Sequence, residues 1–386
     1  MKIAYCLNSI SHVGGIESVT VAKANALAES GHEVYVIITD HIDGAGLSAG
    51  LSSSVHLVDL GVNYYDDDWK SKWNVLKGFF VKRREHRRRL AEALQTIAPD
   101  VVISVGQSEK YMLPEIKGGW VSVREQHYPK DFRRRAAASR SVFYKIAACI
   151  SDFYDYRCKI GEYDRIVVLT NEDRTTNWDK KDKVSVIPNP ITFRSGAVSP
   201  LTALKVVAVG RLAAQKNFLS LIRAFRMVAD RHPDWTLEIY GDGSEREMLQ
   251  NAISELGLEK SVRLCGKTTE VQRKMLEASC FVLSSRYEGL PLVMLEAMSC
   301  GVPVVSYACP CGPKDIITEG VDGFLVPPGD ERMLAERICC LIENPKLRAE
   351  MGASALAKSE NYRIENIVQM WTELFERLSA EKGKKC

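Results

Sequence analysis

The residues best suited to chemistry surround the predicted start of one helix. A strand ends near Ser285, Pro291 suits the first turn of the following helix, and Gly289 lets a ligand approach the backbone. A helix N-terminus presents free amides and a positive dipole, which attract phosphate. Glu288 precedes the helix and Glu296 lies in its second turn, so both carboxylates can accept hydrogen bonds from hydroxyls beside the anion. The pattern indicates a nucleotide-sugar site; an ordinary helix with one capping and one surface glutamate is the alternative.

The elements that must position these residues alternate between strands and helices. Apolar strands are predicted at 2–7, 34–38 and 101–105, and a second series begins at 204–209 after Pro188-Asn189-Pro190. This alternation predicts βαβ units with parallel strands. We therefore expect two Rossmann-like, doubly wound domains that face each other across a cleft, with ligands beyond the carboxyl ends of the strands.

Length and composition exclude several classes of protein. The 386 residues exceed what one core comfortably fills, which favours two domains. No apolar run approaches the roughly 20 residues of a membrane-spanning helix. The first apolar stretch breaks at Asn8 without a signal-peptide core, which predicts a cytoplasmic chain. The eleven cysteines include no CxxC pair, so a reduced protein without bound metal is expected.

The segment EGLPLVMLEAMSCGVPVV resembles the EX7E signature of retaining glycosyltransferases of family 4, because seven residues separate Glu288 from Glu296. Further blocks are similar to that family in the same order. They are the glycine loop at Gly14-Gly15, the linker at 187–190, GRLAAQKN at 210–217, YGDG at 240–243 and the run at 312–330. The resemblance is dense from 204 to 330 and thin between 40 and 160, and it points to members that build bacterial polysaccharides and lipid-linked glycans.

The resemblance implies the GT-B fold and assigns a task to each domain. Residues 1–190 would form the acceptor-binding domain, on which a C-terminal helix at 364–386 packs back. Residues 191–363 would bind the nucleotide sugar. No metal or other cofactor is implied, because Arg211 and Lys216 can neutralise the diphosphate leaving group.

The resemblance also implies individual roles. Gly15 would donate its amide to the diphosphate, Glu296 would accept hydrogen bonds from the ribose, and Glu288 would bind the transferred sugar. The implied donor site is Gly14, Gly15, Arg211, Lys216, Gly241, Glu288, Gly289, Leu290 and Glu296. The implied catalytic set is Glu288, Arg211, Lys216, His127 and Glu125.

Glu125 and His127 lie in the segment REQHYP, where the family presents a residue to the acceptor. Which of the two aligns with the family is open, and a hydrogen-bonded loop residue is the alternative for His127. Asp66-Asp67-Asp68 resembles the DxD motif of Mn²⁺-dependent glycosyltransferases. This triplet precedes a basic helix instead of ending a strand, so we interpret it as a solvated turn.

Two basic segments account for the positive charge of the first half of the chain. Residues 69–90 hold nine basic residues and one acid, and residues 130–145 hold six and one. Apolar and aromatic residues accompany them at Trp69, Trp73, Leu76, Phe79, Phe80, Phe132, Phe143 and Tyr144. The combination predicts contact with an anionic membrane. The contact residues would be Arg83, Arg84, Arg87, Arg88, Arg89, Arg133, Arg134 and Arg135. A solvated helix face and a nucleic-acid patch are the alternatives, and we expect no nucleic-acid partner.

The implied reaction moves a hexosyl or N-acetylhexosaminyl unit from a UDP-sugar to a polyprenyl-diphosphate-linked saccharide with retention of configuration. The enzyme would act at the inner face of the cell membrane during surface polysaccharide synthesis. The alternatives are a UDP-sugar epimerase of the same fold, and a polyanion- or membrane-binding protein without enzymatic activity.

Overall fold

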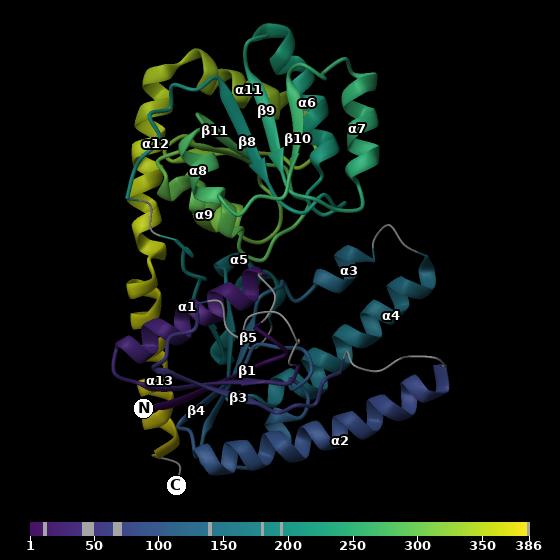
Figure 1. Cartoon of the computed structure of the whole chain (residues 1–386), viewed down its shortest axis with the longest axis vertical. Helices are drawn as coiled ribbons and strands as arrows, with labels where there is room; N and C mark the ends of the chain where they lie inside the picture. Colours follow the sequence, from purple (N-terminus) through teal and green to yellow (C-terminus); the bar gives the residue numbers. More distant parts are fainter. Residues whose placement is uncertain are drawn as a thin grey trace. The chain divides into compact units, whose positions relative to one another are not determined.

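The computed structural model describes residues 1–10, 14–40, 50–64, 72–137, 141–178, 181–193 and 196–383, with only the backbone described at 72–80, 157 and 181. The chain forms two compact units, coloured along the sequence in Figure 1. The first unit comprises Met1–Leu169, Arg174–Pro190 and Ile364–Cys386. The second comprises Thr170–Asp173 and Ile191–Arg363.

The first unit is built on a parallel sheet in the order β3-β2-β1-β4-β5-β6-β7. Its strands are β1 (Lys2–Leu7), β2 (Glu33–Ile38), β3 (Val55–Asp59), β4 (Val101–Ser104), β5 (Val121–Gln126), β6 (Arg165–Val168) and β7 (Val184–Val186). The central strands are continuous apolar runs because helices cover both faces of a parallel sheet. Ile3 illustrates this, since it pairs with Val34 of β2 and Val101 of β4, and all three are buried.

The helices of this unit come from both ends of the chain. They are α1 (Gly15–Glu29), α2 (Lys72–Ile97), α3 (Phe132–Ala136), α4 (Val142–Phe153), α5 (Asn171–Asn177), whose first turn belongs to the second unit, and α13 (Ile364–Gly383). Helix α13, yellow in Figure 1, packs beside α1. Trp371, Leu374 and Phe375 of α13 enter the same core cluster as Ile3. The last helix of the chain therefore completes the core of the first unit.

The second unit has a parallel sheet in the order β10-β9-β8-β11-β12-β13. Its strands are β8 (Lys205–Val209), β9 (Thr236–Tyr240), β10 (Val262–Gly266), β11 (Cys280–Leu283), β12 (Val304–Tyr307) and β13 (Gly323–Val326). Its helices are α6 (Phe218–Arg231), α7 (Arg246–Glu255), α8 (Val271–Leu276), α9 (Leu292–Ser299), α10 (Pro313–Ile316), α11 (Glu331–Glu343) and α12 (Pro345–Ser359). The large core between this sheet and helices α6 and α11 holds Phe225 and Ile338.

The predicted fold class, two Rossmann-like parallel α/β domains, is confirmed. Element ends differ from the sequence reading in a few places: α9 begins at Leu292, with Pro291 as its N-cap. Among the described residues, no helix combines the length and the apolar character needed to span a membrane.

Candidate active site

The strongest chemical pair of the second unit joins two loops at the carboxyl edge of its sheet. Lys216 lies between β8 and α6, and Glu288 lies between β11 and α9. Strands β8 and β11 are parallel neighbours, so both loops emerge at the same edge. The Lys216 Nζ atom lies 2.7 Å from Glu288 Oε1, and both side chains are largely buried. Gly210 leaves room for this lysine, because a Cβ there would lie 3.1 Å from Lys216 Cε.

Hydrogen bonds between the same loops hold this pair in place. The Arg286 amide donates to Gln215 O at 2.8 Å, and Gln215 Nε2 donates to Tyr287 O at 3.0 Å. Ser284 Oγ donates to Lys216 O at 2.9 Å. Because backbone and side chain are both fixed, the ammonium and the carboxylate are positioned before any ligand arrives. Arg211, the second predicted cation, lies exposed on the same β8–α6 loop.

Gly241, predicted as a donor contact, has a geometric task in this unit. Its φ is +146°, and a Cβ there would lie 1.8 Å from Gly210 O. A side chain would therefore displace the β8–α6 loop that carries Arg211 and Lys216. The structure places Gly241 behind this loop as a packing position.

Glu296 lies in the second turn of α9, as the sequence indicates, with its carboxylate half-buried. Thr192 Oγ1 donates to Glu296 Oε1 at 2.9 Å. Burial raises the pKa of Glu296, and the Thr192 hydrogen bond opposes that rise in part.

The loop before α9 is held at both ends. The Glu288 amide donates to Pro310 O at 3.1 Å, and Leu290 is buried. Gly289 lies between them. Gly312 has a φ of +111°, and a Cβ there would lie 2.4 Å from Pro291 Cδ. The N-terminus of α9 is therefore packed against the loop that follows β12.

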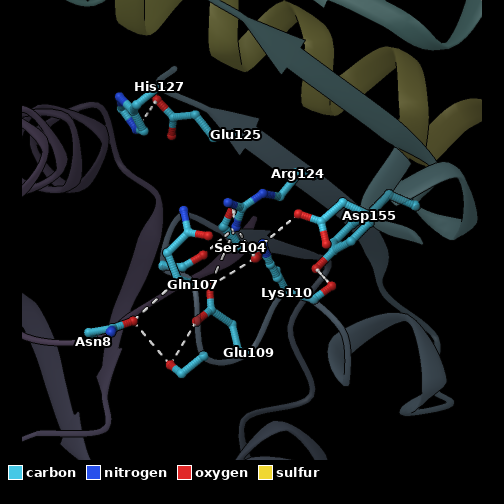
Figure 2. A network of polar contacts seen from close by, with 12 residues as sticks. Asn8, Ser104, Gln107, Glu109, Lys110, Arg124, Glu125, His127 and Asp155 are labelled. Atoms are coloured by element: carbon cyan, nitrogen blue, oxygen red, sulfur yellow. Dashed lines mark hydrogen bonds and ion pairs between the residues drawn. The ribbon is translucent and has the colours of Figure 1, made fainter. Parts of the chain in front are cut away.

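The first unit places Glu125 and His127 together at the carboxyl end of β5 (Figure 2). Glu125 Oε1 contacts the Nζ atom of Lys23, an α1 residue that is fully buried, and lies 3.3 Å from His127 Nε2. His127 Nδ1 lies 3.4 Å from Asn189 Nδ2. The second oxygen of Glu125 has no hydrogen-bond partner among the described residues. Burial pushes the pKa of Glu125 upward, but Lys23 and His127 outweigh it and the pKa is lowered.

The sequence analysis did not identify Lys23 as a partner of Glu125, although its position in the sequence indicates a buried lysine. Lys23 is four residues from both Val19 and Leu27, which line the buried face of α1. A lysine on the apolar stripe of a helix needs a partner inside the protein. Its ammonium also lies 5.8 Å and 5.0 Å from the ring centroids of Tyr5 and Trp371.

A second buried network, also missed, lies at the ends of β4 and β5 (Figure 2). Arg124 donates to Ser104 Oγ at 2.7 Å and to Gly106 O at 2.5 Å. Ser104 Oγ donates to Glu109 Oε1 at 2.8 Å, and this carboxylate lies 3.8 Å from Arg124. Burial raises the pKa of Glu109, with Arg124 opposing. Asn8 Oδ1 links the network to the loop after β1 by accepting from Ser108 Oγ at 3.0 Å.

The buried environment of His127 leads us to expect that the stability of the protein depends on pH. Burial lowers the pKa of His127 to about 4, with Glu125 opposing and Lys23 and Arg124 adding to the decrease. The imidazole is therefore neutral in the folded protein at neutral pH. In the unfolded chain it titrates near 6.5, so protonation favours unfolding as the pH falls. The free energy of unfolding should lose about 3 kcal/mol between about pH 6.5 and pH 4 through this residue.

Denaturant unfolding across that pH range, with wild type and His127→Asn compared, checks this prediction. His86, buried on α2, also has a pKa lowered to about 4, so its contribution remains in both proteins and cancels in the difference. Parallel pH profiles for wild type and His127→Asn would contradict the neutral, buried state of His127.

Gly14 and Gly15 open helix α1. Gly14 is its N-cap residue, and a Cβ at Gly14 would lie 2.2 Å from Glu17 Oε2. The predicted contact of Gly15 with a diphosphate stays a prediction.

Most of the predicted membrane-contact arginines are ion-paired within the protein. Arg87 lies 2.7 Å from Glu115, and Arg88 and Arg89 each lie 2.7 Å from Glu85. Neutralised in this way, these arginines add little net positive charge for a membrane. Arg84 is exposed, and Arg83 lies 5.7 Å from the ring centroid of Tyr111. The triplet 66–68, Trp69 and the side chains of Trp73, Leu76, Phe79 and Phe80 lie outside the description.

The arginines of the second basic segment, residues 130–145, also form ion pairs within the protein. Arg133 lies 2.5 Å from Asp155, Arg134 lies 3.1 Å from Asp152, and Arg135 lies 2.6 Å from Asp131. Asp155 also binds Lys110 at 2.9 Å, as seen in Figure 2. Arg133 therefore links α3 to the π-helical turn at Tyr154–Lys159, and Arg134 links α3 to α4.

One group of potential metal ligands occurs among the described residues. His232, Cys339 and Glu343 each bring a ligand atom within 4.8 Å of the others. Arg231 lies 2.6 Å from Glu343, and this neighbouring positive charge opposes the binding of a metal cation. We assign no metal to this group.

Residues 192–358 match the family model described as glycosyl transferases group 1, which covers less than half of the chain. Over 377 residues the chain is 29% identical to an uncharacterized glycosyltransferase of Haemophilus influenzae, covering 96% of this chain and 98% of that one. It is 26% identical over 352 residues to a lipopolysaccharide 1,6-galactosyltransferase of Salmonella typhimurium, covering 85% and 86%. An exopolysaccharide phosphotransferase of Streptomyces coelicolor is 30% identical over 335 residues, 85% of this chain, but the chain spans only 33% of its length.

A solved structure extends the comparison of the fold. A TarM mutant of S. aureus, crystallised with Fondaparinux, alpha-GlcNAc-glycerol and UDP, superposes with a TM-score of 0.76 at 16% identity and covers 97% of this chain and 99% of that one. The likeness confirms the GT-B architecture. Together with the family match and the names of the relatives, it indicates a glycosyltransferase enzyme.

Proposed function

We propose that the protein is a retaining glycosyltransferase that moves a hexosyl or N-acetylhexosaminyl unit from a UDP-sugar to a lipid-linked saccharide. The observation that carries this proposal is the fixed Lys216–Glu288 pair at the carboxyl edge of the second sheet, with Glu296 in the adjoining helix. This edge is where parallel α/β sheets bind ligands.

In the proposed complex, Lys216 and Arg211 stabilise the negative charge that develops on the departing UDP, so no metal ion is required. Glu288 accepts a hydrogen bond from the transferred sugar, and the amides of Gly289 and Leu290 lie beside it. Glu296 accepts hydrogen bonds from the ribose. Lys216 thereby contacts both Glu288 and the diphosphate.

We propose that the new bond forms on the face from which UDP leaves. The acceptor oxygen bonds to the anomeric carbon, the carbon–oxygen bond to UDP breaks, and the acceptor proton passes to a phosphate oxygen of the donor. The state of Glu125 supports this mechanism, because its contact with buried Lys23 makes it a poor nucleophile. His127, with a pKa near 4, is a weak base.

The acceptor is proposed from the names of relatives. The Salmonella relative acts on lipopolysaccharide, a glycolipid, and the solved TarM structure contains UDP. These support a UDP-linked donor and an acceptor anchored in lipid, and therefore an enzyme at the inner face of the cell membrane during surface polysaccharide synthesis.

Nucleoside-diphosphate release from UDP-, GDP- and ADP-sugars, with and without a bacterial lipid-linked oligosaccharide extract, tests the proposal. Release from one donor should require the extract. Glu296→Ala should weaken donor binding about 10- to 100-fold, the effect of losing a hydrogen bond to a charged group. Glu331→Ala, a matched change in the first turn of α11, should leave release unchanged.

Other results would favour other functions. Turnover of a UDP-sugar without acceptor would indicate an epimerase or a hydrolase. Unchanged donor binding by Glu296→Ala would remove this residue from the site. Absence of both UDP-sugar binding and turnover would leave a binding protein that uses its cationic surface.

A further inference from the structure

Helix α4 carries large apolar side chains on its outer face. Five of them are 52–83% exposed: Val142, Phe143, Ile146, Ile150 and Phe153. Tyr144 and Tyr154 lie at the two ends of the helix and are 57% and 46% exposed. In Figure 1, α4 lies at the edge of the first unit, away from its strands. Exposed apolar side chains in such a continuous group mark a contact surface.

The exposed apolar residues lie on one face of the helix. At 3.6 residues per turn, successive side chains are turned by about 100°, which places these five within an arc of about 100°. The residues that attach α4 to its unit, Ala148 and Asp152, are buried and lie on the opposite side. The helix therefore packs against the first unit through a narrow side that contains Ala148 and Asp152. Its apolar side faces outward.

The surroundings of α4 are positively charged. Residues 130–159 contain eight Lys or Arg and three Asp, a net charge of +5. All three aspartates are ion-paired with arginines of this segment, and Lys159 is ion-paired with Glu115 outside it. Lys145 on α4 itself is exposed. Phe153 also lines a pocket of about 920 Å³ whose wall includes Lys130 and Arg134.

We propose that α4 inserts its apolar face into an anionic lipid leaflet and is the main membrane contact of the protein. The inference deepens the proposed function and rests on it in one respect, since a lipid-linked acceptor places the enzyme at a bilayer. An apolar helix face beside excess positive charge has the chemistry of an interfacial helix in an anionic membrane. Tyrosines at both ends suit the level of the lipid headgroups.

The structure favours this contact over the arginines of α2. The arginines of both regions are ion-paired, so charge does not distinguish them. Among the described side chains of α2, however, only Val81 is a large exposed apolar residue, whereas α4 exposes five on one face. A second copy of the chain is a poorer occupant of the α4 face, because two surfaces with a charge of +5 repel each other.

Vesicle co-sedimentation of the full chain tests the proposal, with phosphatidylglycerol–phosphatidylcholine vesicles as the probe. Phe143→Glu combined with Ile150→Glu should weaken partitioning about 100-fold or more, since each buried apolar side chain contributes about tenfold. The matched control is Leu204→Glu with Val321→Glu, two residues that are 50% and 53% exposed in the second unit. This control should bind like wild type.

Two further experiments distinguish membrane binding by apolar insertion from binding by electrostatic attraction. Because insertion is apolar, wild type should stay largely bound at about 0.5 M salt, where charges are screened within a few Å. Neutralising Arg83, Arg84, Arg87, Arg88 and Arg89 together should change partitioning less than the α4 variant does. The proposal is overturned if the α4 variant binds like its control, or if salt releases wild type completely. It is also overturned if wild type does not bind vesicles, and a dimer held by α4 in size-exclusion chromatography would then identify a second copy of the chain as the occupant.

Failure of this inference can be told apart from failure of the proposed function. Calorimetry with UDP reports the donor site, where the α4 variant should match wild type and Glu296→Ala should not. Vesicle binding reports α4, where Glu296→Ala should match wild type. Each proposal is thus contradicted by a different measurement on a different variant.

Discussion

Replacing Lys216 with methionine is expected to lower kcat by about 10²- to 10³-fold. The ammonium is aimed at the carboxyl edge of the sheet and held there by Glu288 and the paired loops. Removing one pre-positioned group that stabilises the charge of a transition state has this size of effect. Steady-state release of UDP with saturating donor and acceptor measures it.

A control variant is needed to distinguish a loss of catalysis in Lys216→Met from a loss of folding. Lys205→Met is matched, because Lys205 lies in the same unit, is 21% exposed against 18% for Lys216, and pairs with Glu238 at 3.0 Å. It should retain kcat. Lys216→Met with Glu288→Gln removes the unpaired carboxylate and should restore thermal stability without restoring the rate. A kcat within a few-fold of wild type for Lys216→Met would exclude this lysine from leaving-group stabilisation.

The second large effect is expected in the first unit, where Lys23→Met should lower the free energy of unfolding by about 3–5 kcal/mol. The substitution leaves the Glu125 carboxylate buried without its cation. The pKa of Lys23 is itself lowered by burial, with Glu125 opposing, which shows that the pair shares a desolvated site. Denaturant unfolding monitored by far-UV circular dichroism gives the change.

The double variant Lys23→Met with Glu125→Leu makes this prediction specific. Replacing both charged partners with apolar residues should recover most of the lost stability, because no uncompensated charge remains. Its activity then distinguishes the two interpretations of Glu125. A stable but inactive double variant would indicate that Glu125 faces the acceptor, whereas a stable and active one would give it a structural task only. No loss of stability in Lys23→Met would contradict the buried pair.

The fold was predictable because buried parallel strands are continuous apolar runs separated by helical patterns. Lys2–Leu7 occurs as predicted from the sequence. Strand β3, Val55–Asp59, was not predicted, because it is an edge strand with polar and partly exposed residues that breaks the apolar pattern.

The candidate site was predictable only where a local motif carries it. Glu288 and Glu296 belong to one short segment, so their spacing is visible in the sequence. Lys23 and Glu125 are 102 residues apart, and Arg124 of β5 meets Glu109 of the loop after β4. Their pairing depends on strand order and on which side chains the helices cover. The ion pair of Arg87 with Glu115, which comes from another part of the fold, is likewise not visible in the sequence.

The return of α13 to the first unit has a consequence for how the protein is made. Translation supplies the strands of the first unit early, but Trp371, Leu374 and Phe375 can reach its core only after the second unit has been made. The second unit lies between these parts in the chain and has a core that is complete before α13 is made. Domains fold as units during synthesis and usually in N-terminal order, but here the connectivity lets the second unit complete its core first. The nascent first unit therefore waits on the ribosome with an open apolar surface, and a prematurely terminated chain leaves that surface for chaperones to bind.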